Sequence, residues 1–294
     1  MMLGAFYGLS TALTWGIGNV LIKSQVSKLA TAQLLTIRAV FGAVTAILAY
    51  FFLGKNDALL LLTPLAWLVM VGSVLTGYFG SDLLFVYALK ELPLSYVFPI
   101  QATYPLIATG LAWVIYGEAI SAWVFIGAVL VIAGVSLIGS EEPRQASPIS
   151  QSQRMRGFTW TALSAVGWGL SAIFLRAALE EFDPVTVNTG VGLLTACAFL
   201  IISRPLAIAS IVRREPRIGQ ALGLAGALGG TGLSNLFYIL TIQAAGVAQA
   251  TVLASTAPLF TSFFAVFFLG ERLTVKLTLG TFLTVIGIGV LVGG

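Results

Sequence analysis

Side chains able to do chemistry are scarce in the apolar parts of this sequence, and Asp82 stands out first. It is the only carboxylate well inside an apolar run, GYFGSDLLFVYALK. Burying a charge in a membrane is costly, so an intramembrane carboxylate is a functional candidate by default. Two functions fit: carrying a proton, or pairing with the ammonium group of a substrate. The structural alternative is a protonated side chain, or one hydrogen-bonded to a neighbouring helix.

Arg38 is the second candidate, because it lies about 6 to 9 Å inside another apolar block. Its partner would be a cluster of carbonyl groups or the carboxylate of Asp82, and the sequence favours neither. Lys23 and Arg176 lie instead at the ends of apolar blocks, where long basic side chains usually extend to the headgroups. The functional alternative for these two is binding the carboxylate of a passing amino acid.

Aromatic and amide side chains supply the remaining recognition chemistry of the apolar blocks. Apolar walls with a few polar points suit amino acids or drug-like molecules. The structural alternative is interface belts or helix packing, which fits Trp15 and Trp168 least because both lie near the middle of a block. The expected substrate-binding residues are Trp15, Asn19, Tyr78, Asp82, Gln101, Tyr104, Trp168, Ser234, Asn235 and Tyr238.

The composition excludes several chemistries. The chain has one cysteine, Cys197, and no histidine, so it lacks the side chains for a thiolate metal cluster, a common zinc site or a histidine proton relay. We find no nucleophile and base in a catalytic pattern, and we expect no enzyme activity, no metal and no cofactor. The stretch GALGGTG is not a phosphate loop, because no Gly-Lys-Ser/Thr follows it. Close packing or a hinge explains it better.

Membrane-spanning helices must position these residues. Only 9% of the 294 residues are charged and 58% are hydrophobic, against roughly 25% charged in a soluble domain. The apolar residues come in blocks of about 20, the length that crosses a hydrocarbon layer of about 30 Å. We therefore expect an all-α integral membrane protein with about ten transmembrane helices. The expected spans are 3–23, 32–53, 65–89, 95–116, 122–139, 157–176, 185–203, 218–242, 247–268 and 274–293.

The sequence also contains an internal repeat. Sliding it against itself by 168 − 15 = 153 residues, without a gap, aligns scarce residue types. The aligned pairs include Trp15 with Trp168, Pro105 with Pro258, and Glu118 with Glu271. The chain then divides into a five-helix repeat over 1–139, a polar linker over 140–156 and a second repeat over 157–294. An odd number of spans makes the repeats inverted, a transporter design with a central cavity and alternating access.

Two aligned pairs are candidates for gating or structural roles. Pro105 and Pro258 each remove a backbone hydrogen bond near the middle of the fourth helix of their repeat. This suits either a static kink or bending during gating. Glu118 and Glu271 follow a glycine that can end one helix and lie just before the next. A carboxylate there favours the positive end of the following helix, so we interpret both as structural.

Lysine and arginine are distributed unequally over the loops. The loops after spans 2, 4, 6 and 8 hold only Lys55 and Arg176, and the loops after the odd-numbered spans hold most of the others. The positive-inside rule then makes the basic loops cytoplasmic and both termini external. The net charge of +4 suits this signal better than a nucleic-acid surface. The expected partners are a small-molecule substrate and the lipid bilayer, with a monomer as one option and no nucleic acid.

The sequence resembles the drug/metabolite transporter superfamily, in its ten-helix form built from two EamA repeats. The matching segments are ALTWGIGNVLIK and AVGWGLSAIFLR, TIRAVFGA, FVYALKELPLS, TYPLIA and TAPLFT, and YGEAIS and LGERLT. They cover essentially the whole chain and are closest to the aromatic amino-acid exporters. The resemblance implies a bacterial inner-membrane protein that exports aromatic and other bulky amino acids or related metabolites. It would also let Glu118 and Glu271 anchor a gate.

Other functions compete with amino-acid export. A multidrug exporter of organic cations would also use Asp82 beside aromatic rings. A sugar-phosphate or nucleotide-phosphate carrier would need Lys or Arg deep in the cavity, where the sequence places mainly aromatics and amides. A channel would need a repeated ring of charges or a carbonyl filter, which we do not find. The sequence has no nucleotide-binding motif, so the expected driving force is a substrate or ion gradient.

Overall fold

The computed structural model is helical throughout the residues that it describes. These are 2–25, 28–53, 59, 63–92, 97, 100–101, 103–119, 121–139, 150–203, 205–257, 259–261, 263–264 and 274–293. Six helical segments among them are long and apolar enough to cross a membrane, and shorter apolar helices accompany them. The predicted all-helical membrane fold is therefore confirmed.

The first half of the chain follows four of its five expected spans closely, and α6 covers the second part of the remaining one, 95–116. Its helices are α1 (Met2–Lys23), α2 (Thr31–Leu53), α3 (Pro64–Ser73), η1 (Val74–Ser81), α4 (Asp82–Glu91), α6 (Tyr104–Tyr116) and α7 (Ala122–Gly139). The segments α3, η1 and α4 are continuous and form one span, whose middle part η1 is a π-helix. Single π-helical turns inside α-helices are often found at functional sites.

The second half differs from the expectation in three places. Its helices are α8 (Gln151–Ala178), α9 (Pro184–Ile202), α10 (Pro205–Arg214), α11 (Pro216–Leu228), α12 (Leu233–Ala254) and α14 (Val275–Gly293). Helix α8 begins six residues earlier than expected, because Ser150 and Gln153 form a reciprocal capping box. Helix α10 occupies a segment that was expected to be a loop. The expected span 218–242 is interrupted between α11 and α12.

Contacts between the two halves obey the shift of 153 found in the sequence. Several glycines of one half lie directly against a residue of the other half, and each such contact has an equivalent contact elsewhere. The equivalent contacts are Gly4 with Ala245 and Gly157 with Leu92, Gly16 with Phe260 and Gly169 with Ile107, and Gly134 with Thr284 and Gly287 with Val131. In each case the shift of 153 residues converts one contact into its equivalent. For example, Gly4 becomes Gly157 on adding 153, and Ala245 becomes Leu92 on subtracting 153. The halves therefore exchange the same contacts, as a two-fold pseudo-symmetric pair does.

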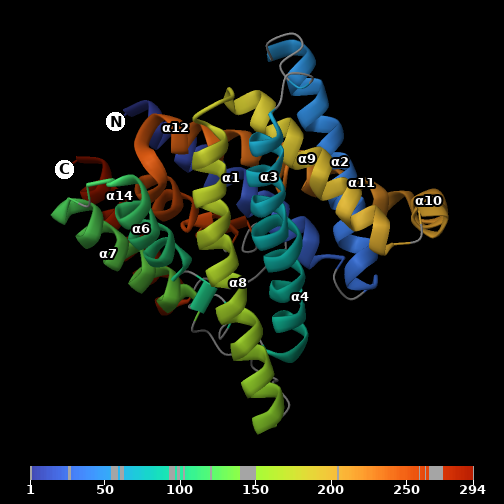
Figure 1. Ribbon diagram of the computed structural model, residues 1–294. Coiled ribbons are helices and arrows are strands. Elements are labelled where there is room, and N and C mark those ends of the chain that lie inside the picture. The colour runs from blue at the N-terminus through green and yellow to red at the C-terminus, as the bar shows by residue number, and fades with distance from the viewer. Residues whose placement is uncertain are drawn as a thin grey trace.

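The helix arrangement follows from this exchange. Helix α1 packs on α11 and α12 of the second half, and α8 packs on α3, η1, α4 and α6 of the first. Two equivalent pairs meet each other directly, α2 with α9 and α7 with α14. Figure 1 shows α7 and α14 together at one edge of the molecule, with α2 and α9 crossing elsewhere. The two halves thus surround a shared interior.

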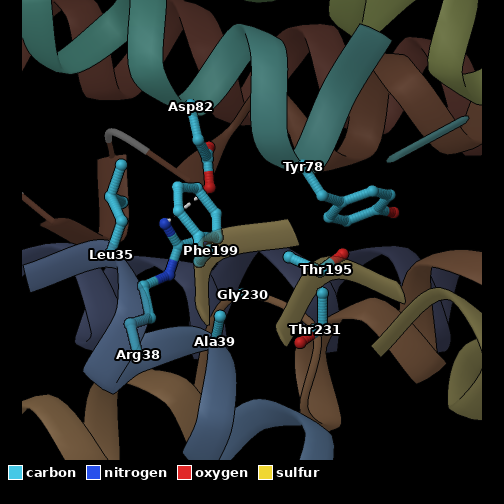
Figure 2. Close-up of a pocket in the computed structure, with 9 residues that line it drawn as sticks. All are labelled: Leu35, Arg38, Ala39, Tyr78, Asp82, Thr195, Phe199, Gly230 and Thr231. Carbon is cyan, nitrogen blue, oxygen red and sulfur yellow. Dashed lines mark hydrogen bonds and ion pairs between the residues drawn. The ribbon is translucent and has the colours of Figure 1, made fainter. Parts of the chain in front are cut away.

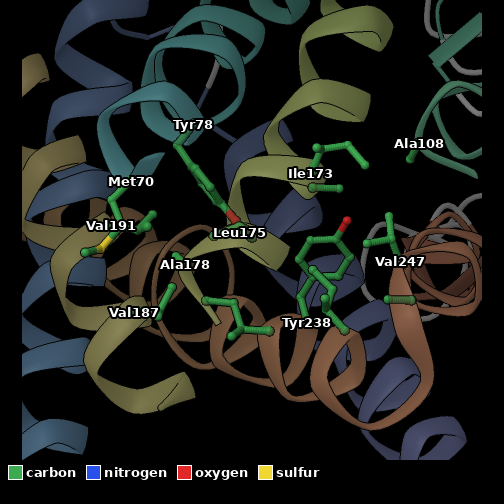
Figure 3. Packing of buried hydrophobic residues seen from close by; sticks show 14 of the residues in the cluster. Met70, Tyr78, Ala108, Ile173, Leu175, Ala178, Val187, Val191, Tyr238 and Val247 are labelled. Carbon is green, nitrogen blue, oxygen red and sulfur yellow. The ribbon is translucent and has the colours of Figure 1, made fainter. Parts of the chain in front are cut away.

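The largest buried cluster lies at this junction. It joins Met70 and Tyr78 from the first half to Leu175, Val191 and Tyr238 from the second. Figure 3 shows the two tyrosines inside it, among apolar side chains from both halves. Apolar burial alone does not drive helix association in lipid, so close approach at small residues matters more there than in water. The glycine contacts between the halves supply this close approach.

Candidate functional site

A cavity lies between the two halves of the molecule. The space between its walls and across its open mouth is about 1020 Å³, and part of this space is open to solvent. Its walls come from α1, α2, α4, α6 and α8 and from the residues that end α12. The lining residues include Ile22 and Leu89, at the ends of α1 and α4, so the mouth lies at that end of the bundle. The predicted central cavity is thus present in the structure.

Six of the ten predicted substrate-binding residues line this cavity. They are Trp15, Asn19, Asp82, Gln101, Tyr104 and Trp168. The other four, Tyr78, Ser234, Asn235 and Tyr238, are almost fully buried in the surrounding structure. Arg38 also lines the cavity but was left out of the predicted set. The sequence signal that could have placed it there was its position inside an apolar block.

Arg38 and Asp82 form an ion pair in the wall of the cavity. The Arg38 Nη1 atom donates a hydrogen bond of 2.8 Å to Asp82 Oδ2, and the two side chains are only 15% and 14% exposed. The sequence favours neither a cluster of carbonyl groups nor Asp82 as the partner of Arg38, and in the structure the partner is Asp82. Figure 2 shows the pair bridging α2 and α4. A smaller cavity behind it is lined by Tyr78, Thr195 and Thr231.

The π-helical segment η1 places Asp82 in this wall. The single hydroxyl proton of Ser81 is shared between two carbonyl oxygens, that of Thr76, five residues earlier and 2.6 Å from Oγ, and that of Ser164 on α8, 2.9 Å from Oγ. The Ser164 Oγ atom donates back to the carbonyl oxygen of Ser81 at 2.9 Å. These bonds fix the last turn of η1 against α8. Asp82 follows directly as the first residue of α4.

A matching irregularity in the second half makes room for Arg38. Helix α11 ends at Leu228 and α12 begins at Leu233. Between them, Gly230 has φ +70, and a Cβ there would lie 2.8 Å from Nε of Arg38. Glycine is needed at this position for both reasons. Shifted by 153, residues 74–81 of η1 correspond to 227–234, so the third span of each repeat is irregular at the same place.

Aromatic rings from both repeats form the deep wall of the cavity. The equivalent residues Trp15 and Trp168 meet with ring centroids 6.0 Å apart and planes at 65°. Tyr238 packs on Trp15 at 5.7 Å, and Tyr78 packs edge-on against Trp168 at 5.0 Å. Offset and edge-to-face pairs are the favourable arrangements for aromatic side chains. The paired tryptophans therefore form a rigid apolar surface where the repeats meet.

Asn235, the repeat equivalent of Asp82, has a different setting. The Tyr78 hydroxyl donates to Oδ1 of Asn235, whose Nδ2 donates to Oδ1 of Asn188 on α9 at 2.8 Å. All three side chains are almost fully buried. In each half, a polar residue of the third span thus bonds to one of the second span: a charged pair in the first half, neutral amides in the second. Asn188 is not among the predicted site residues, although an amide inside an apolar block is a signal for it in the sequence.

Gln101 brings an available acceptor to the cavity. Its Oε1 atom is buried and has no hydrogen-bond partner among the residues that the structure describes. An unsatisfied buried acceptor is costly, so a ligand with an N–H or O–H group there would be favoured. Tyr104 offers less, because its hydroxyl already donates to the carbonyl oxygen of Thr251 at 2.9 Å.

Glu118 contacts the other half at the opposite end of the bundle from the cavity mouth. Helix α12 is bent at Gly246, which has φ +81. Beyond the bend, the carboxylate of Glu118 accepts hydrogen bonds from the backbone N–H groups of Val247, at 3.0 and 3.2 Å, and Ala248, at 3.4 Å. Glu118 therefore caps a helix of the other repeat, and the interface closes there.

Pro105 is positioned differently from the expectation. Helix α6 begins at Tyr104, with Pro105 in its first turn. A proline there removes no helical hydrogen bond, since the first N–H groups of a helix have no partner within it. Pro105 therefore removes no hydrogen bond within α6 itself, while helical residues 100–101 lie before it in the same expected span, and its role in gating or as a static kink stays a prediction. Gly117, with φ +64, ends α6 just before Glu118. Pro258 and Glu271 lie outside the described residues.

The fold and the cavity define an integral membrane protein of two pseudo-symmetric helical repeats around a shared binding space. The model of the EamA-like transporter family matches residues 2–140 and 155–293. The chain therefore belongs to the EamA-like transporter family, and it is a membrane transporter of small molecules.

One relative agrees with this assignment, and one solved structure shares the fold. An uncharacterized transporter of Archaeoglobus fulgidus is 27% identical over 223 residues, which cover 75% of this chain and 74% of the relative. A solved structure, titled only as the crystal structure of a protein, superposes with a TM-score of 0.79. The superposition covers 98% of this chain and 95% of the other at 20% identity, so it supports the fold alone.

Proposed function

We propose that this transporter exports aromatic and other bulky amino acids by alternating access of its two repeats. The observation that carries the proposal is the charge balance of the cavity. Arg38 and Asp82 place one positive and one negative group in an otherwise apolar and amide-lined space. A zwitterion matches that pair group for group, because its ammonium complements the carboxylate and its carboxylate complements the guanidinium.

The aromatic wall supplies the second part of recognition. With the backbone groups of an amino acid at Arg38 and Asp82, a side-chain ring reaches toward Trp15 and Trp168. Stacking and edge contacts with these rings favour aromatic and other large apolar side chains. The unpartnered Oε1 atom of Gln101 accepts a hydrogen bond from the ammonium or from a polar side chain.

The same charge balance weakens the competing substrates. An organic cation would pair with Asp82 and leave Arg38 without a partner in an apolar wall. A phosphate monoester would pair with Arg38 and leave Asp82 without a partner. Leaving a buried charge without its partner costs several kcal/mol. A substrate with no net charge avoids both costs, so amino acids are favoured over organic cations and sugar or nucleotide phosphates.

The two ends of the bundle support export as the direction of transport. The cavity mouth is at the end where α1 and α4 finish, near the basic loops, and the Glu118 contact closes the other end. With the basic loops in the cytoplasm, this conformation takes substrate from the cytoplasm, as an exporter must. The pseudo-symmetry between the repeats supports a second conformation in which the closed end opens.

Flux into proteoliposomes tests this function. Purified full-length protein should take up labelled phenylalanine or tryptophan faster than empty liposomes, and the comparison is made with and without a pH gradient. If neither amino acid moves under either condition, amino-acid transport is wrong. If the flux ignores the gradient and persists in Asp82→Asn, Asp82 carries no proton, and its role is then limited to binding.

A further inference from the structure

Helix α10 lies where a membrane surface must be. It comes between α9 and the span that starts at α11, and both are apolar enough to cross a membrane. With ten residues, α10 is about 15 Å long. It starts three residues after α9 ends and stops two residues before α11 begins. Figure 1 shows α10 at the periphery of the molecule, beside α11. Chain continuity thus places α10 at the headgroup level.

One face of α10 is anchored to the bundle. Ile208 is buried, and Ile211 and Val212 pack with it against a cluster that contains Ile218 and Leu222 of α11. Gly219 allows this close packing, because a Cβ there would lie 2.8 Å from Cγ1 of Val212. The apolar side chains of α10 are therefore partly satisfied by protein, which fixes the direction in which its other face points.

The end of α10 and the turn after it carry a cluster of basic side chains. Arg213 and Arg214 are the last residues of α10, and Arg217 lies in the first turn of α11. All three are exposed. None forms an ion pair with a residue in the part of the chain that the structure describes. Arginine in the last turn of a helix also interacts favourably with the negative end of the helix dipole. This interaction does not occupy the hydrogen-bond donors of the guanidinium groups, so they are available to a ligand.

We propose that α10 and Arg213, Arg214 and Arg217 form a binding surface for the headgroups of anionic phospholipids. Guanidinium groups bind phosphate oxygens through paired hydrogen bonds, and a basic amphipathic helix in the interface is attracted to anionic lipid. Each basic residue near an anionic surface strengthens this attraction roughly fivefold. The surface is distinct from the substrate cavity, whose described lining contains none of these residues.

The lipid beside α10 can be identified by fluorescence quenching in full-length protein. Ala209, which is exposed on α10, is changed to cysteine in a Cys197→Ser background and labelled with a bimane dye. The protein is reconstituted in liposomes that contain a trace of headgroup-labelled nitroxide lipid, either phosphatidylglycerol or phosphatidylcholine. We expect severalfold stronger quenching by the phosphatidylglycerol probe. Equal quenching by the two probes in this parent protein would overturn the proposal without any further variant.

Charge variants separate this surface from a general attraction to the protein. Changing Arg213, Arg214 and Arg217 together to glutamine should remove the preference for phosphatidylglycerol, and changing them to lysine should keep much of it. Changing Lys28, Lys90 and Arg156 to glutamine removes as many charges from the same end of the bundle and should leave the quenching ratio unaltered. A preference that survives the first triple change, or is lost in this control, contradicts the proposal.

Discussion

At the residue scale, the ion pair of Arg38 and Asp82 has the greatest consequences. Each charge is tolerated inside the protein because the other is 2.8 Å away. An isolated carboxylate in a membrane span suggested two roles from sequence, proton carrier or ammonium partner. In the structure the guanidinium group of Arg38 already pairs with this carboxylate, so a proton or a substrate ammonium must displace Arg38 from it. Asp82 is thus half of a pair, and in the proposed function both members of the pair bind the substrate.

Removing one charge should therefore be worse than removing both. We expect Asp82→Ala to lower the free energy of unfolding by about 3 kcal/mol, because Arg38 is left without a partner. The double change Arg38→Met with Asp82→Leu should recover most of that loss. Denaturant unfolding in detergent micelles measures both variants. A double variant that is no more stable than Asp82→Ala would show that the two residues are not coupled in the folded protein.

Glu118 offers a second test at this scale. Glu118→Ala removes the acceptor for the N–H groups of Val247 and Ala248, so we expect a loss of about 1 to 2 kcal/mol in the free energy of unfolding. Glu118→Gln, which keeps one carbonyl oxygen, should lose less. Glu180→Ala is the control, because Glu180 is exposed in the turn after α8 and its ion pair with Arg176 is long, at 3.9 Å. An equal effect of Glu118→Ala and Glu180→Ala would mean that the cap contributes nothing.

At the scale of elements, the sequence predicted most spans and their repeat, since apolar length and a constant shift of scarce residues are strong signals. Three local features were not predictable. Helix α10, with ten residues, is too short to be found as an apolar block of about 20 residues, and the π-helical segment has no distinctive residue preference. The position of Pro105 depends on where α6 begins. For the cavity wall, the aromatic and amide residue types were predictable from the sequence. Which of these residues line the cavity and which are buried in the core depends on how each helix is rotated about its axis, and the sequence does not specify that rotation.

Two glycines of α14 test the packing of equivalent elements. A Cβ on Gly287 would lie 2.8 Å from the backbone nitrogen of Val131 on α7, whereas a Cβ on Gly289 would meet nothing within 4 Å. We expect Gly287→Ala to lower the melting temperature, because the two helices must move apart. Gly289→Ala should leave it unchanged or raise it, since alanine favours the helix. A scan of both variants by differential scanning fluorimetry makes the comparison, and equal behaviour would contradict the close approach of α7 and α14.

At the scale of the whole molecule, the exchanged contacts between the halves connect the fold to transport. One end of the shared interior is open at the cavity, and the other is closed around Glu118. Two repeats that contact each other by the same residue pairs can interconvert such states by exchanging their roles. The charged pair of Arg38 and Asp82 lies in one repeat only, because the equivalent of Asp82 is Asn235, so the two conformations of the proposed alternating access would not be chemically identical.

Orientation in the membrane is testable with impermeant labels. Lys28 and Glu180 are exposed at opposite ends of the bundle, in the turns after α1 and α8. In a Cys197→Ser background, Glu180→Cys should react with an impermeant maleimide on intact cells, and Lys28→Cys only after permeabilisation. The reverse pattern would contradict the proposed orientation. Reaction of both from one side would contradict the odd number of crossings between them.

The most direct test of the central claim is counterflow with substrates of different charge. Proteoliposomes loaded with unlabelled phenylalanine should accumulate labelled phenylalanine, and excess external tryptophan should abolish this. Phenethylamine and 3-phenylpropionate keep the ring but carry one charge each, so at the same concentration each should inhibit far less, because Arg38 or Asp82 would lose its partner. Inhibition by the amine or the acid as strong as that by tryptophan would contradict a cavity built for zwitterions.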